Sequence, residues 1–182
     1  MLRPSPVAPY LCSMRRLLLP VALLLAGLAS KAQNTTASQA PYLQNPTVPE
    51  FKVLLPDSTH WFSKADLKKG RAVLFMAFNP DCEHCQKQAD IIVDNLKGPM
   101  EKVEIVMTTY QDLKKMREFI RDHKLSGHPN IIVGRDVNYF FGPFFNMHYS
   151  PFLAFYDKQG KLAKAYEGGA RAELLKTTVD GL

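Results

Sequence analysis

The residues best suited to chemistry are two cysteines separated by two residues, Cys82 and Cys85, in the segment FNPDCEHCQKQ. The pair follows the continuous apolar run of residues 71–78 and opens a segment with the apolar spacing of a helix. Unpaired N–H groups and the helix dipole stabilise a thiolate at a helix start. A cysteine one turn later can attack the mixed disulfide that the first one forms. The spacing therefore predicts a redox pair, with Cys82 as nucleophile, Cys85 as resolving cysteine, and a Cys82–Cys85 disulfide in the oxidised form.

Two other roles of the pair are less favoured. A structural clip between residues so close in sequence removes little chain entropy, so it would stabilise the fold poorly. A zinc site needs further ligands, and the sequence offers only His84 between the cysteines and the distant His148, with no second C-x-x-C or H-x-x-x-H motif. We therefore expect no metal and no cofactor.

The N-terminus has the pattern of a secretory signal peptide. Arg15 and Arg16 precede an apolar run at residues 17–29, and small residues precede a cleavage site between Ala32 and Gln33. The run is shorter than the roughly 20 residues that span a bilayer, which favours a cleaved leader over an uncleaved membrane anchor. Residues 1–32 are thus predicted to be a signal peptide, with residues 1–13 as an upstream extension if Met14 is the true start. The protein is therefore expected to be exported, to the periplasm if the host is a Gram-negative bacterium.

The charge of the chain argues against a nucleic-acid partner. The formal net charge is +6, but the leader carries four basic residues and no acid. Removing those four from the 23 basic residues leaves 19 against 17 acidic residues. A mature chain this close to neutral has no basic stripe to neutralise phosphates, so we expect no nucleic acid to bind.

The rest of the sequence predicts a linker followed by one α/β domain. Residues 33–49 are polar and contain three prolines, which predicts a flexible linker, and the domain is expected at residues 50–182. Apolar runs and periodicities predict a β-hairpin at 51–62, buried strands at 71–78, 103–107 and 131–133, helices at 85–96, 112–124 and 170–179, a helical turn at 140–145 broken at Gly142-Pro143, and a hairpin at 151–167. Leu174, Leu175 and Val179 are expected on the buried face of the last helix. This order predicts a central mixed β-sheet flanked by helices.

The segments FMAFNPDCEHCQKQ and FFGPFFNMHYSPFLAFYDKQGKLAKAYEGG resemble the thioredoxin superfamily, in particular its exported TlpA-like and ResA-like thiol-disulfide oxidoreductases. The resemblance covers about residues 51–182 and implies a thioredoxin-like fold in which residues 112–133 form an inserted helix and strand. It also implies a cis peptide bond before Pro151 that faces the cysteines. Such a bond would turn the Ser150 backbone toward an extended substrate, so Ser150 and Pro151 are the expected substrate-binding residues.

The chain departs from the family pattern around the cysteines. Asp81 stands where an aromatic residue is usual, and Met76 stands where thioredoxin has a buried carboxylate. Glu83 is either a replacement for that carboxylate or an ordinary acid of a first helical turn. A protonated His84 would favour the Cys82 thiolate, whereas Asp81 and Glu83 would disfavour it. We therefore expect Glu83 and His84 to tune the pKa of Cys82 in opposite directions.

The resemblance implies an exported enzyme that reduces or exchanges disulfides of protein substrates and is re-reduced by a membrane-bound electron donor. Two alternatives use the same cysteines. A Sco-like copper protein would bind the metal through Cys82, Cys85 and His148, although Sco-like proteins usually have three residues between their cysteines. A peroxiredoxin would use Cys82 against peroxides, but the T-x-x-C signature is missing. An interaction module without redox chemistry is the third alternative.

Overall fold

The computed structural model describes residues 39–182 of the chain. The predicted signal peptide, its upstream extension and residues 33–38 of the predicted linker lie outside the described residues. Within the described part, no helix is long and apolar enough to cross a membrane.

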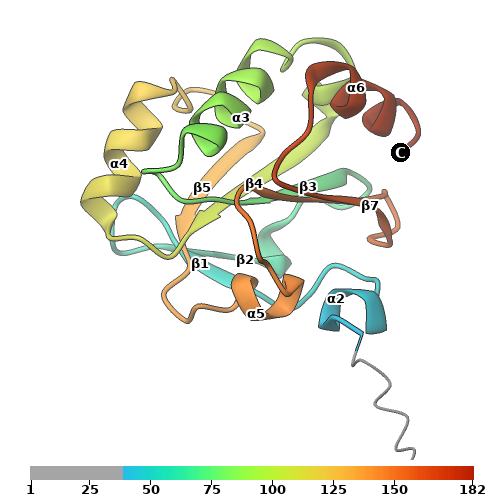
Figure 1. The fold of residues 1–182 in the computed structure, drawn as a ribbon, viewed down its shortest axis with the longest axis horizontal. Coiled ribbons are helices and arrows are strands. Elements are labelled where there is room, and N and C mark those ends of the chain that lie inside the picture. The colour runs from blue at the N-terminus through green and yellow to red at the C-terminus, as the bar shows by residue number, and fades with distance from the viewer. Residues whose placement is uncertain (1–38) are drawn as a thin grey trace, which may run out of the picture. The chain divides into compact units, whose positions relative to one another are not determined.

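A mixed β-sheet runs through the described domain (Figure 1). Among residues 39–182 it has seven strands in the order β2-β1-β5-β4-β3-β6-β7. The strands β3, β4 and β5 are parallel to one another, and the other neighbours pair antiparallel. The bounds are β1 (Lys52–Leu54), β2 (Trp61–Ser63), β3 (Ala72–Ala77), β4 (Val103–Thr109), β5 (Ile131–Arg135), β6 (Phe152–Tyr156) and β7 (Leu162–Glu167). The predicted mixed sheet and both predicted hairpins are confirmed.

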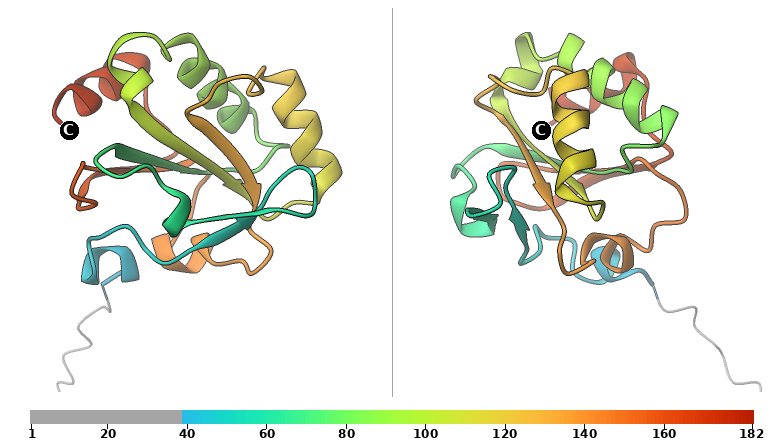
Figure 2. Two further views of the ribbon diagram at one scale, coloured as in Figure 1. Left: turned by 180° about the vertical axis from the view of Figure 1, so that it is seen from behind. Right: turned by 90° about the vertical axis from the view of Figure 1, so that its left-hand side faces the viewer.

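Helices cover both faces of the sheet (Figures 1 and 2). On one face lie α3 (Glu83–Asp94), α4 (Leu113–Asp122) and α6 (Ala172–Asp180), and on the other lie α2 (Pro41–Gln44) and α5 (Phe141–Phe145). Two short 3-10 helices, η1 (Lys64–Asp66) and η2 (Gly98–Lys102), complete the described elements. The predicted inserted helix and strand are α4 and β5, and β5 lies between β4 and β1.

The inner strand β3, between β4 and β6, is buried along its whole length because both faces of the sheet are covered. Side chains alternate between the faces of a strand. Leu74 and Met76 accordingly pack in the core beneath α3, α4 and α6, whereas Val73, Phe75 and Ala77 pack in the core on the α5 side. This strand leads directly into the cysteines, so its burial fixes the point at which they emerge.

Two local predictions on the helices were wrong. The expected break at Gly142-Pro143 does not occur, because α5 runs through both residues. A proline is tolerated in the first turn, where its missing N–H has no intrahelical partner to lose. Leu174 is 42% exposed, whereas the other residues expected on the buried face of α6, Leu175 and Val179, are buried.

The end of the predicted linker belongs to the folded domain. Residues 41–44 form α2, and the ring of Tyr42 packs edge-on against Phe145 and Phe152 with centroids 5.6 Å away in both cases. Val48 is buried, and its N–H donates a 2.9 Å hydrogen bond to the carbonyl of Gly160. The polar composition and the prolines predicted flexibility, but these two apolar side chains anchor the segment to the α5 side of the sheet.

Candidate active site

A tight turn places Cys82 at the start of α3. The carbonyl of Asn79 accepts a 3.1 Å hydrogen bond from the N–H of Cys82, and the Asn79 side-chain oxygen accepts one of 3.1 Å from the N–H of Asp81. Cys82 has extended backbone angles, and its carbonyl accepts a 3.0 Å hydrogen bond from the N–H of Gln86. Cys82 is thus the N-cap of α3, in the position that the sequence predicts.

The two cysteines are free thiols in unequal surroundings. Burial by itself raises the pKa of the Cys82 thiol, but hydrogen bonds from the backbone N–H and thiol of Cys85, from Ser150 and from the backbone N–H of His84 together leave that pKa below its ordinary value. Cys85 is fully buried, and this burial raises the pKa of its thiol to about 12. The N–H of Asn79 donates to the Cys85 sulfur over 3.4 Å. The half-buried Cys82 is therefore the cysteine suited to attack.

The difference between the two thiols predicts a pH profile. Iodoacetamide reacts with thiolates, so the alkylation rate of Cys82 is expected to rise with pH and reach half its maximum below the ordinary thiol pKa of 9.0. Cys85 is expected to remain unmodified throughout this range because its thiol stays protonated and shielded. Mass spectrometry of the alkylated peptides measures both rates. A midpoint for Cys82 at or above pH 9.0, or faster labelling of Cys85, would contradict the assignment.

The predicted cis peptide bond is present between Ser150 and Pro151. The carbonyl of Ser150 lies 3.6 Å from the sulfur of Cys82 and accepts its thiol hydrogen. Cys82 on α3 and the residues before β6, 68 positions later, therefore meet at one edge of the sheet. A peptide backbone group thus lies beside the reactive sulfur.

The loop around Pro151 is tied to α3 by Gln88, a residue that the sequence reasoning missed. The buried Gln88 side chain accepts a 2.7 Å hydrogen bond from the N–H of Ala170, and the N–H of Gly168 donates to the Pro151 carbonyl over 2.9 Å. Gly169 has a φ of +99°, and a Cβ there would lie 2.7 Å from the Gln88 oxygen. The adjacent glycines were the available signal, since a Gly-Gly pair is typical of backbone with positive φ, which both Gly168 and Gly169 adopt.

The residues expected to tune the pKa of Cys82 lie at the start of α3. Glu83 and His84 are exposed, and within residues 39–182 neither side chain makes a hydrogen bond or an ion pair. His84 lowers the pKa of Cys82 through its backbone N–H, which any residue but proline would supply. Asp81 pairs with Lys115 of α4, so its negative charge beside Cys82 is partly offset. The effect of the Glu83 and His84 side chains stays a prediction.

His148 is not brought together with the cysteines as a metal ligand set. Its Nδ1 lies 3.7 Å from a carboxylate oxygen of Glu167, and its backbone N–H donates to that same oxygen. Across residues 39–182 no three His, Cys, Asp or Glu side chains are placed to hold a metal ion. The arrangement of Cys82, Cys85 and His148 that the Sco-like alternative requires is therefore not formed.

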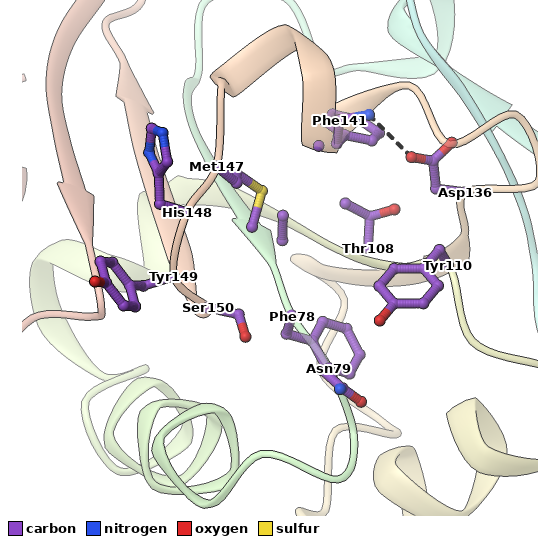
Figure 3. Close-up of a pocket in the computed structure, with 12 residues that line it drawn as sticks. Phe78, Asn79, Thr108, Tyr110, Asp136, Phe141, Met147, His148, Tyr149 and Ser150 are labelled. Atoms are coloured by element: carbon purple, nitrogen blue, oxygen red, sulfur yellow. Dashed lines mark hydrogen bonds between the residues drawn. The ribbon is translucent and has the colours of Figure 1, made fainter.

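A pocket of about 300 Å³ opens beside the cysteine site (Figure 3). Asn79 and Ser150, the two residues that contact the cysteine sulfurs, line one side of it. The other walls come from the ends of β4 and β5, from α5 and from the loop that precedes Pro151. The pocket is therefore connected to the cysteine site through Asn79 and Ser150, while its lining does not include the cysteines themselves.

Comparison with known families gives one match. Residues 45–178 match the model of the AhpC/TSA family. The chain belongs to the AhpC/TSA family. A comparison with curated proteins finds no match.

Solved structures confirm the thioredoxin fold of this AhpC/TSA-family chain. A secreted Mycobacterium tuberculosis disulfide oxidoreductase homologous to E. coli DsbE is 18% identical, with a TM-score of 0.61 over 72% of this chain and 96% of that one. MTB dsbF is 22% identical, with a TM-score of 0.62 over 74% and 98%. StoA from Bacillus subtilis is 20% identical, with a TM-score of 0.56 over 73% and 98%. The thioredoxin-like fold that the resemblance implies is confirmed.

Proposed function

We propose that this AhpC/TSA-family protein is an exported thiol-disulfide oxidoreductase that reduces or exchanges disulfides of protein substrates through Cys82 and Cys85. The observation that carries the proposal is the asymmetry of the two thiols. The pKa of Cys82 is lowered at the start of a helix and its sulfur is half-exposed, whereas burial raises the pKa of Cys85 one turn behind it. The thioredoxin fold of the solved neighbours supports the same chemistry.

The reaction follows from this asymmetry. The Cys82 thiolate attacks one sulfur of a substrate disulfide, forms a mixed disulfide and releases the other substrate sulfur as a thiolate. Cys85 then loses its proton and attacks the Cys82 sulfur, which releases the second substrate thiolate and leaves a Cys82–Cys85 disulfide. Two electrons pass from the protein dithiol to the substrate. The carbonyl of Ser150, next to the Cys82 sulfur, is positioned to bind an extended substrate backbone.

The finer parts of the proposal concern direction and location. The resemblance to TlpA-like proteins favours reduction of substrate cysteines, with a membrane-bound donor restoring the Cys82–Cys85 dithiol. Export rests on the leader pattern of residues 1–32. Sequencing the N-terminus of the mature protein tests it, and a chain that retains residues 1–32 in the cytoplasm would contradict it.

The reduction potential of the cysteine pair tests the function. The protein is equilibrated with defined mixtures of reduced and oxidised dithiothreitol or glutathione, and the fraction of dithiol is read by alkylation and mass spectrometry. A reduction potential of about −270 mV supports a reductase, and one of about −120 mV supports an oxidase. A pair that cannot be cycled by dithiols would refute the redox function. Fast peroxide consumption retained in Cys85→Ser would favour the peroxiredoxin alternative instead.

A further inference from the structure

The pocket that Ser150 shares with the cysteine site is lined by two buried polar residues that are not fully hydrogen-bonded. Thr108 at the end of β4 and Asp136 just after β5 are 2% and 4% exposed. One Asp136 oxygen accepts a 2.9 Å hydrogen bond from the N–H of Phe141. Its Oδ1 and the Thr108 hydroxyl have no hydrogen-bond partner among residues 39–182. Figure 3 shows both residues on the same wall of the pocket. Buried polar atoms are rarely left unpaired, so these two call for an explanation.

The lining of the pocket carries a net negative charge. Asp136 is the only acidic residue in its lining, and within residues 39–182 it forms no ion pair. The adjacent Arg135 forms no ion pair with Asp136 in the described part of the chain, and it interacts electrostatically with Asp112 at the start of α4. His148, the one basic residue of the lining, lies at the rim with its ring against Glu167. A carboxylate in such surroundings favours a cationic hydrogen-bond donor.

The other walls suit the aliphatic stem of a long side chain. Phe78, Phe141 and Met147 line the pocket together with Tyr110, whose ring is 47% exposed at the mouth. The volume of about 300 Å³ is at the lower end of ligand pockets, which matches one side chain better than a large cofactor. Lysine and arginine bury their methylene stems against apolar surface and keep the charged end for a polar partner.

We propose that this pocket is a specificity site for a lysine or arginine that neighbours the target cysteine of the substrate, with Asp136 and Thr108 as the groups that accept its hydrogen bonds. The inference rests on the proposed function, because it assumes that Cys82 attacks a peptide disulfide. Since Ser150 contacts the Cys82 sulfur and also lines the pocket, a substrate cysteine at Cys82 brings its sequence neighbours to the mouth of the pocket.

The test uses blocked peptides of the form Gly-X-Cys-X-Gly, supplied as symmetric disulfide dimers with lysine, norleucine or glutamate at X. The reduced protein converts each dimer to two peptide thiols and becomes a Cys82–Cys85 disulfide, and acid quenching with mass spectrometry gives the rate. The quantity compared is the lysine-to-norleucine rate ratio in each variant relative to the wild type. Intrinsic differences in reactivity between the peptides cancel in this comparison.

We expect Asp136→Asn to lower the lysine-to-norleucine ratio about tenfold, the effect of losing one charged hydrogen bond. Thr108→Val, which removes only the hydroxyl, is expected to lower it about threefold. Asparagine retains an oxygen that can accept from the N–H of Phe141, and valine is close in shape to threonine, so both variants preserve the local packing. The glutamate peptide is expected to react faster with Asp136→Asn than with the wild type.

Glu83→Gln is the matched control. It also removes one negative charge, but Glu83 lies next to Cys82 and outside the pocket lining. Its ratio is expected to change less than about twofold, since the charge of an exposed residue is screened by water and salt. An equal fall in Glu83→Gln, or an unchanged ratio in both pocket variants, overturns the pocket assignment. If the wild type fails to reduce even the norleucine dimer, the proposed function itself is refuted.

Discussion

Cys82→Ser is expected to reduce disulfide reductase activity to the background level, a loss of about a thousandfold or more. Serine has no thiolate, and an alkoxide is not available at neutral pH to take its place. The loss is measured as the rate at which the protein, supplied with dithiothreitol, reduces insulin or another protein disulfide. Secondary structure should be unchanged, because the N-cap position accepts serine well.

Cys85→Ser provides the matched control for this experiment. It retains the Cys82 thiolate but lacks the resolving thiol. Cys82 should therefore still attack the substrate disulfide, and the mixed disulfide with the substrate should accumulate. Non-reducing electrophoresis would detect this adduct, which must be absent in Cys82→Ser and in the double variant. A stable adduct formed by Cys82→Ser through Cys85 would contradict the assigned roles, because Cys85 is fully buried.

Phe75→Ala is expected to lower the free energy of unfolding by about 3–5 kcal/mol, the usual cost of truncating a buried phenylalanine. Phe75 is fully buried in β3, and its ring contacts Phe51, Phe141 and Tyr156 at centroid distances of 5.0, 5.5 and 5.7 Å. Its removal would leave a cavity where the N-terminal segment, α5 and the sheet meet. Urea unfolding measures the change, provided that the slope is the same in both proteins.

Tyr149→Ala is the control for that prediction, since its side chain is 72% exposed. Its free energy of unfolding should change by less than about 0.5 kcal/mol. A loss below about 1 kcal/mol for Phe75→Ala would mean that the core on the α5 side rearranges to fill the space. The pocket wall that Phe141 forms would then shift together with the rearranged core.

The sequence predicted those parts of the fold and site that depend on patterns local in the chain. The continuous apolar run before the cysteines predicts a strand covered on both faces. The apolar spacing of the next segment predicts a helix that begins at the cysteines. The cis bond before Pro151 was predicted from the resemblance rather than from physics. Each of these elements is confirmed by the structure.

The remainder depends on contacts between distant segments, which no local pattern encodes. Asp136 becomes a pocket residue only because β5 ends beside β4 and α5 turns back over it. Among the aromatic residues at 139–149, Tyr139 is 60% exposed whereas Phe141 and Phe145 are buried. Which of these side chains are buried depends on how α5 packs against the sheet.

The packing of α2 decides where a shortened version of this protein can begin. A chain starting at Glu50 would keep every strand but lose Tyr42 and Val48, and with them the cover over Phe145 and Phe152. It would also lose the backbone pairing of Thr47 with Lys161 at the outer hairpin. Such a truncation would expose an aromatic surface prone to self-association, so recombinant versions for crystallisation or screening should start no later than Gln39.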